Sequence, residues 1–147
     1  MTEYKSKHGI VSRSREELYM SFVDLSRIRE MLPEDKKEMI FADYDHLSAT
    51  VQNFTIGVRV TGRQPYERIE LSNAEGTPFA FDILLHFDEA GEPGKTDFSI
   101  TVEADLNLVM KAMLGGKIKS GLDKIVDGIV DVSEGRMPEG MPEGMKF

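Results

Sequence analysis

Residues 106–132 read LNLVMKAMLGGKIKSGLDKIVDGIVDV. Apolar residues recur in this stretch at steps of three and four, which is the period of a helix face and not of a strand. They are Met110, Leu114, Ile118, Leu122, Ile125, Ile129 and Val132. A helix with one apolar face must pack on another apolar surface, and the only large one lies between Met39 and Ala104. The stretch therefore predicts a sheet that packs against one long helix.

From Glu38 onward the pattern changes to a period of two, and turn residues divide it into strands. The expected strands are Met39–Asp43, Leu47–Asn53, Thr55–Arg63, Tyr66–Asn73, Phe79–Phe87 and Thr96–Asp105. In the last two, apolar residues such as Phe81 and Ile100 alternate with polar ones. The outer face is expected to carry His86 and the carboxylates Asp82, Asp88, Glu103 and Asp105. This alternation predicts an antiparallel sheet with one face in water.

The segment before the sheet predicts one strand and two short helices. Within residues 4–11 the inward-facing set is expected to be Tyr4, Ser6, His8 and Ile10. Ser14 and Glu17 form a capping box for a helix over residues 15–23. A second short helix is expected to run through Ile28, Met31 and Leu32 and to end before Pro33.

This order of elements resembles the Bet v 1-like or START-like (SRPBCC) superfamily, in its small bacterial polyketide cyclase/dehydrase-like branch. The resemblance is carried by EYKSKHGIV, by the helix pair ending at MLPEDK, by GTPFAFDILLHF and by DFSITVEADLNLVMKAML. It implies an α+β helix-grip fold: a curved antiparallel sheet of about seven strands, two short helices and one long C-terminal helix. It also implies a cavity for lipids, sterols, polyketides or other apolar ligands. The glycine-rich loop of some branches is replaced here by Asp45-His46.

The composition narrows the function further. The 147 residues predict a single domain over residues 1–132, followed by a Pro/Gly/Met-rich tail over residues 133–147. A net charge of -8 disfavours nucleic acid and anionic lipid surfaces as partners. There is no cysteine, no leader-like N-terminus and no apolar run long enough to span a membrane, so we expect a cytoplasmic protein.

His8 is the one candidate for acid–base chemistry, because it is expected to face inward beside Tyr4 and Ser6. The alternative is a core histidine satisfied by neighbouring polar groups. His46 falls in a turn and His86 on the outer face, so the three histidines share no metal-ligand spacing. We expect neither a metal nor a cofactor.

The expected ligand-binding surface combines the inner face of the sheet with the start of the long helix. The residues expected to line it are Tyr4, His8, Val58, Val60, Phe81, Ile83, Phe98, Ile100, Met110, Met113 and Leu114. Arg59 and Arg63 alternate with apolar residues, which is compatible with an anion-binding rim but more typical of outward, solvated side chains.

The long helix carries Gly115, Gly116, Gly121 and Gly128, each of which costs about 1 kcal/mol relative to alanine in a helix interior. Such residues indicate a kink, a close approach to a neighbouring strand, or space for a ligand. The flexible thioethers of Met110 and Met113 suit an adaptable pocket, although close packing without a ligand explains the pattern equally well.

The tail SEGRMPEGMPEGMKF cannot continue the helix. If it is ordered, Met137, Met141, Met145 and Phe147 must dock on the protein itself or on a second copy. A homodimer formed through this arm is therefore an expectation.

Three functions remain open from the sequence. The first is a binding protein for a small hydrophobic ligand held between the sheet and the long helix. The second is an enzyme of cyclase or dehydratase type that uses His8 as acid or base. The third is a protein-interaction module, which predicts an exposed apolar patch.

Overall fold

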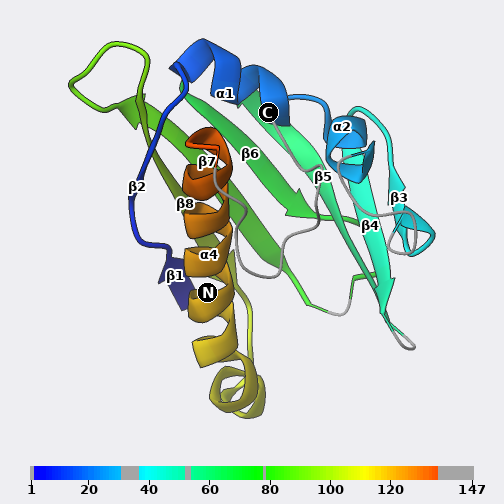
Figure 1. Ribbon diagram of the computed structural model, residues 1–147. Helices are drawn as coiled ribbons and strands as arrows, with labels where there is room; N and C mark the ends of the chain where they lie inside the picture. The colour runs from blue at the N-terminus through cyan, green and yellow to red at the C-terminus, as the bar shows by residue number, and fades with distance from the viewer. Residues whose placement is uncertain (1, 31–36, 52–53, 78, 136–147) are drawn as a thin grey trace.

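The computed structural model describes residues 2–30, 37–51, 54–77 and 79–135. Its strands are β1 (Thr2–Lys5), β2 (Gly9–Val11), β3 (Ile40–Ala42), β4 (His46–Val51), β5 (Phe54–Gln64), β6 (Arg68–Asn73), β7 (Phe81–Glu89) and β8 (Thr96–Ala104). Its helices are α1 (Arg15–Phe22), α2 (Leu25–Glu30) and α4 (Leu108–Ser133). A curved sheet grips the long helix α4, which is the predicted α+β helix-grip fold (Figure 1).

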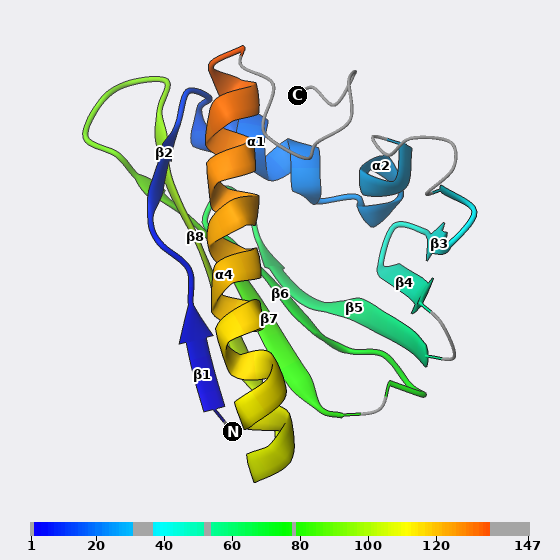
Figure 2. The ribbon, with the colours of Figure 1, turned by 60° about the horizontal axis from the view of Figure 1, so that its bottom comes forward.

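The sheet is antiparallel throughout, in the order β1-β8-β7-β6-β5-β4-β3, and β2 also pairs with β8. Helix α4 packs over β1, β2 and β8 at one side of the sheet, whereas α1 and α2 lie against β7, β3 and β4. Figure 2 shows this division: α4 runs along β1 and β2, and β3 to β5 curve away from it. The described helices therefore cover the inner face of the middle strands only in part.

The starts of α1 and α4 follow from capping side chains. Ser14 Oγ accepts a hydrogen bond from the Glu17 backbone N–H (3.2 Å), and Glu17 Oε1 accepts one from the Ser14 backbone N–H (3.3 Å), which confirms the predicted capping box. At α4, Asn107 Oδ1 accepts a hydrogen bond from the Met110 backbone N–H (2.9 Å). The predicted end of the second helix, with Met31, Leu32 and Pro33, lies outside the described residues.

The first strand is interrupted by a β-bulge. Lys5 pairs with Thr101 and Gly9 pairs with Phe98, so three residues on this strand face two on β8. Ser6 fixes the bulge, because its backbone N–H donates to the Ile100 carbonyl (2.9 Å) and its Oγ accepts from the Ile100 N–H (2.8 Å). The sheet consequently has eight strands where about seven were expected.

The bulge inverts the alternation that follows it. Gly9 and Val11 are buried, whereas Ile10 is 46% exposed and His8 is exposed. The prediction that His8 and Ile10 face inward is therefore wrong. The physical reason is the extra residue, since one added position moves every later side chain to the opposite face.

A second bulge lies in β5. The register with β6 shifts between Val60 and Gly62, so Arg63 pairs with the buried Ile69 on the inner face. Arg63 is therefore not an outward, solvated side chain, and its side chain is only 20% exposed. A glycine inside a strand often marks a bulge, and Gly62 marks this one.

The buried stripe of α4 differs from the predicted one at its C-terminal half. Val126 is fully buried and Ile125 is 51% exposed, although the predicted stripe contained Ile125. The buried face of an α-helix rotates slowly relative to a seven-residue repeat. In the C-terminal half of α4 the face toward β2 therefore carries Val126 and Val130, which meet Gly9. Met113 is also placed outward, with 66% of its surface exposed.

Candidate functional site

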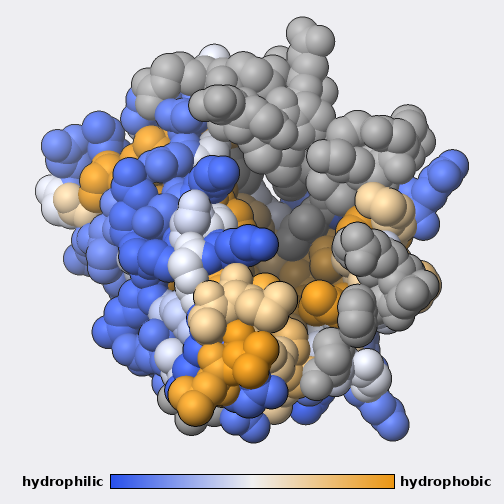
Figure 3. Space-filling model, turned by 90° about the horizontal axis from the view of Figure 1, so that it is seen from below, coloured by the Kyte–Doolittle hydropathy of each residue, from blue (hydrophilic) through white to orange (hydrophobic). Residues whose placement is uncertain are grey.

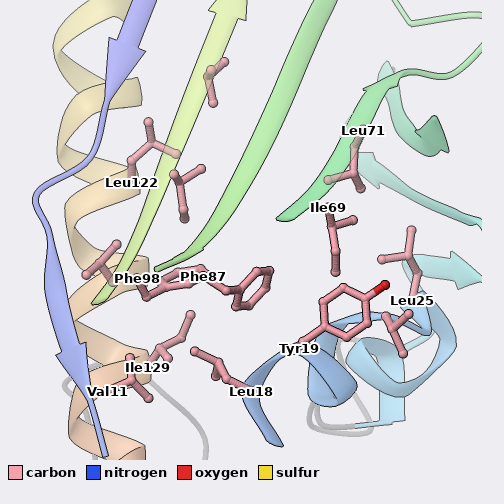
Figure 4. Close-up of a cluster of buried hydrophobic side chains, with 14 of the residues drawn as sticks. Val11, Leu18, Tyr19, Leu25, Ile69, Leu71, Phe87, Phe98, Leu122 and Ile129 are labelled. Atoms are coloured by element: carbon pink, nitrogen blue, oxygen red, sulfur yellow. The ribbon is translucent and has the colours of Figure 1, made fainter. Parts of the chain in front are cut away.

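The inner face of the sheet is closely packed at the end covered by α1. Here the rings of Phe87 and Phe98 lie 5.4 Å apart, and those of Tyr19 and Phe87 lie 5.8 Å apart in an edge-on arrangement. Leu18 and Val11 complete this cluster with no exposed surface (Figure 4). Side chains fill this end of the space between sheet and helices.

The described residues cover the other end of the inner face less completely. A set of apolar side chains packs against the core but keeps part of its surface exposed. These side chains, which we call the concave cleft, are Leu47, Val58, Val60, Ile83, Leu85, Met110 and Ile118. Figure 3, seen from the end of the molecule where α4 begins, shows a hollow with apolar surface inside it. The part of the sheet that α4 leaves uncovered is therefore an apolar depression.

Strand pairing explains how these residues meet. Val58 lies opposite Leu47 on β4, and Val60 lies opposite Leu71 on β6. Leu71 is in turn paired with Ile83 on β7. Because the side chains of directly paired residues point to the same face, one continuous apolar row crosses four strands.

Arg63 closes the cleft at the α1 end. Its Nη2 donates to the carbonyl oxygens of Val23 (2.8 Å) and Tyr44 (2.9 Å), and its Nη1 donates to Asp45 Oδ1 (2.8 Å). The guanidinium carbon also lies 4.1 Å from the centre of the Tyr44 ring. Since Val23 is the C-terminal cap of α1, Arg63 ties β5 to the α1–α2 junction and leaves few donors for a ligand.

The predicted lining residues fall into three groups. Val58, Val60, Ile83 and Met110 lie in the concave cleft, and Tyr4 and Leu114 are half-buried. Phe81, Phe98 and Ile100 are buried in the core. His8 and Met113 are exposed outside it.

Leu47, Leu85 and Ile118 belong to the cleft but were absent from the prediction. The period-two pattern of β7 and the helical stripe of α4 contain the signal for Leu85 and Ile118. Leu47 becomes recognisable only through its pairing with Val58.

His8 lies instead on the outer face of the sheet. Its Nδ1 is 2.8 Å from Asp97 Oδ1, and its side chain is 65% exposed. It borders a shallow polar hollow of about 240 Å³ together with Lys5, His86, Asp88 and Thr101. His8 is thus separated from the concave cleft by the sheet itself.

His86 occupies the same outer hollow as His8. Its Nε2 is 3.1 Å from Thr101 Oγ1. Partial burial lowers the pKa of His86 below its ordinary value. The nearby Arg68, His8 and Lys5 side chains act in the same direction, whereas Asp88 acts in the opposite one.

Within the described ranges, no group of three or more histidine, aspartate or glutamate side chains is arranged to hold a metal ion. Among the helices of that part of the chain, none has the length and apolarity needed to cross a membrane.

Comparisons by sequence identify no relatives: the chain matches no protein-family model and no curated protein. Comparisons by structure find proteins of similar fold. Norcoclaurine synthase from Thalictrum flavum, as a point mutant with a transition-state analogue, superposes with a TM-score of 0.69 at 12% identity, over 91% of this chain and 94% of that one. A solution structure from Thermobifida fusca gives 0.69 at 12% identity, over 90% and 93%.

A third similar structure is the Aha1 dimer from Colwellia psychrerythraea. It superposes with a TM-score of 0.54 at 12% identity, over 84% of this chain and 97% of the other. At these identities the likeness concerns the fold. It places the chain among proteins with the Bet v 1-like helix-grip fold.

Proposed function

We propose that this protein binds a small apolar ligand in the concave cleft. The observation that carries the proposal is the division of the inner face: packed solid under α1 and open, yet apolar, between α4 and β4 to β7. Apolar surface left in contact with water is unfavourable by roughly 25 cal/mol per Å². A ligand that covers it gains this free energy.

The cleft offers its ligand few charged or hydrogen-bonding groups. Arg63 donates hydrogen bonds to Val23, Tyr44 and Asp45 of the protein itself. The inward-facing members of β7 are Phe81, Ile83, Leu85 and Phe87. Binding by shape and apolar contact, with little polar recognition, is the mode this lining supports. The similar fold of norcoclaurine synthase, whose structure is of a point mutant in complex with a transition-state analogue, is compatible with ligand binding on this scaffold.

The structure agrees unequally with the two other functions considered from the sequence. The enzyme hypothesis relied on His8 facing the cleft, and His8 lies on the opposite side of the sheet. The interaction hypothesis relied on an exposed apolar patch, which does exist at the start of α4. Membership in the bacterial polyketide cyclase/dehydrase-like branch and a cytoplasmic location remain parts of our proposal.

The test uses a matched pair of substitutions. Ile83 faces the cleft and its neighbour Leu84 faces the outer side of the same strand; both are half-buried. We expect the wild-type protein to bind 1-anilinonaphthalene-8-sulfonate with an increase in dye fluorescence. Ile83→Trp fills the cleft and should weaken dye binding at least tenfold, about 1.4 kcal/mol, whereas Leu84→Trp should leave it unchanged.

The chain contains no tryptophan, so each variant also carries a single fluorescent reporter. Leu84→Trp, which retains dye binding, should transfer energy to the bound dye, whereas Ile83→Trp, which displaces the dye, should transfer little. Circular dichroism checks that both variants are folded. A wild-type protein that takes up no dye, or two variants that lose dye equally, would contradict the proposal.

A further inference from the structure

The start of α4 carries an apolar patch that faces water. Leu108 is 83% exposed, Val109 is 67% exposed and Met113 is 66% exposed. We call these three residues the α4 patch. Val109 and Met113 are four positions apart and therefore lie on one side of the helix. Single exposed apolar residues are common, but three large ones together in a described surface mark a site of contact.

The α4 patch lies at the end of the molecule where the concave cleft opens. The first turns of α4 project beyond the end of the sheet (Figure 1), and the view onto that end shows apolar surface beside the hollow (Figure 3). Met110, from the same turns, belongs to the cleft itself. One helix end therefore contributes both to the cleft and to the exposed patch.

The first turns of α4 carry lysines and no acidic residue, although the exposed Asp105 precedes the helix. Between Leu106 and Leu122 the chain contains Lys111, Lys117 and Lys119 but no aspartate or glutamate, although the net charge of the molecule is -8. Lys119 is paired with Asp123 (2.9 Å), whereas Lys111 and Lys117 have exposed side chains on the same turns as the patch. Charges act over about 10 Å at ordinary ionic strength, so a surface that touches the first turns of α4 comes within reach of Lys111 and Lys117.

We propose that the α4 patch docks on the surface of an anionic phospholipid bilayer. Apolar side chains that enter the interface, flanked by lysines that attract lipid phosphates, are the features that hold a helix on a membrane without spanning it. The expectation that the overall charge keeps the protein away from such surfaces overlooks these lysines. Docking would hold the mouth of the cleft against the bilayer, so that an apolar ligand exchanges without crossing water. This last step rests on the proposed function.

A second copy of the chain is a poorer occupant. A twofold interface centred on the α4 patch would place Lys111 and Lys117 of one copy close to the same lysines of the other. The three side chains are also far fewer than the roughly 20 residues a side of a stable interface. An anionic bilayer places no lysines opposite Lys111 and Lys117, and a peripheral helix can bind it through a few side chains.

Vesicle co-sedimentation tests the inference with the full-length chain. We expect binding to vesicles of phosphatidylcholine mixed with phosphatidylglycerol, little binding to phosphatidylcholine alone, and a decrease as salt is raised. Val109→Gln with Met113→Gln should weaken binding about tenfold or more. Lys111→Gln with Lys117→Gln should weaken it about fivefold for each lysine.

The matched control is Phe41→Gln, because Phe41 on β3 is as exposed as Val109, at 67%. It should bind vesicles like the wild type. Equal binding by wild type and the Val109/Met113 variant, equal loss in the Phe41 control, or a concentration-dependent dimer that the Val109/Met113 variant abolishes would each overturn the inference.

Dye binding separates this inference from the proposed function. The Val109/Met113 variant leaves the cleft intact and should keep its affinity for 1-anilinonaphthalene-8-sulfonate. A protein that binds the dye but not vesicles refutes docking alone. One that binds vesicles but not the dye refutes the proposed function alone.

Discussion

Gly9 is the residue at which β2 approaches α4 most closely. A Cβ atom at this position would lie 2.5 Å from Val126 Cγ1 and 2.7 Å from Val130 Cγ2. These are branched, packed side chains that have little room to move. Gly9→Ala should therefore destabilise the protein by about 1–3 kcal/mol in urea denaturation, through overpacking.

Gly116 supplies the matched control for Gly9. It lies in α4, and a Cβ atom there would meet no atom within 4 Å. Gly116→Ala should stabilise the protein by about 1 kcal/mol, because alanine is the better helix former. If both substitutions changed the midpoint in the same direction, the close contact of β2 with α4 would be wrong.

His86 makes the stability of the fold dependent on pH. Since partial burial lowers its folded-state pKa, the unfolded chain takes up a proton first as the pH falls. The fold is therefore destabilised by this group as the pH falls below about 6.5, which is the pKa of histidine in the unfolded chain. His86→Gln, which retains a partner for Thr101, should show a smaller loss of stability between neutral and mildly acidic pH. Identical slopes for the two proteins would contradict this assignment.

At the scale of the element, strand β7 keeps the alternation that its sequence predicts. Phe81 is 6% exposed and faces the core, whereas Asp82 is exposed and hydrogen-bonds to Ser72. Phe81→Ala should cost about 3–5 kcal/mol, as expected for a large side chain removed from a core. Asp82→Ala should change the urea midpoint little. Equal midpoints for the two variants would show that the two faces of β7 are assigned incorrectly.

For helix α4 the element was predicted correctly, but part of its buried face was not. The expected helix is confirmed, and it ends at Ser133. Its glycines produce no interruption of the helix, and Gly115 instead lies under the Tyr4 ring of β1, with a Cβ position 3.3 Å from Tyr4 Oη. Its buried stripe shifts from Ile125 to Val126 because the helix follows β2 at that point.

At the scale of the whole molecule, the oligomeric state remains a prediction. The residues on which the expected arm exchange depends, Met137, Met141, Met145 and Phe147, lie outside the described part of the chain. The single-domain boundary at residue 132 is likewise a prediction. If the arm joins two copies, the full-length protein should be a dimer by light scattering, and deletion of residues 134–147 should make it a monomer. Monomers in both cases would rule out the arm exchange.

By itself, the sequence determined the elements and their order, because the helical stripe, the capping box at Ser14 and the alternation in β7 are all properties of neighbouring residues. Only the tertiary structure decided which face the side chains beyond each bulge take. The bulges before Gly9 and at Gly62 are defined by pairing with another strand, and each one reverses a face: His8 turns outward and Arg63 inward. Likewise, the cleft and the α4 patch depend on where α4 packs: it lies over β1, β2 and β8, and the described helices leave part of the middle strands uncovered. This arrangement is set by contacts between residues far apart in the chain.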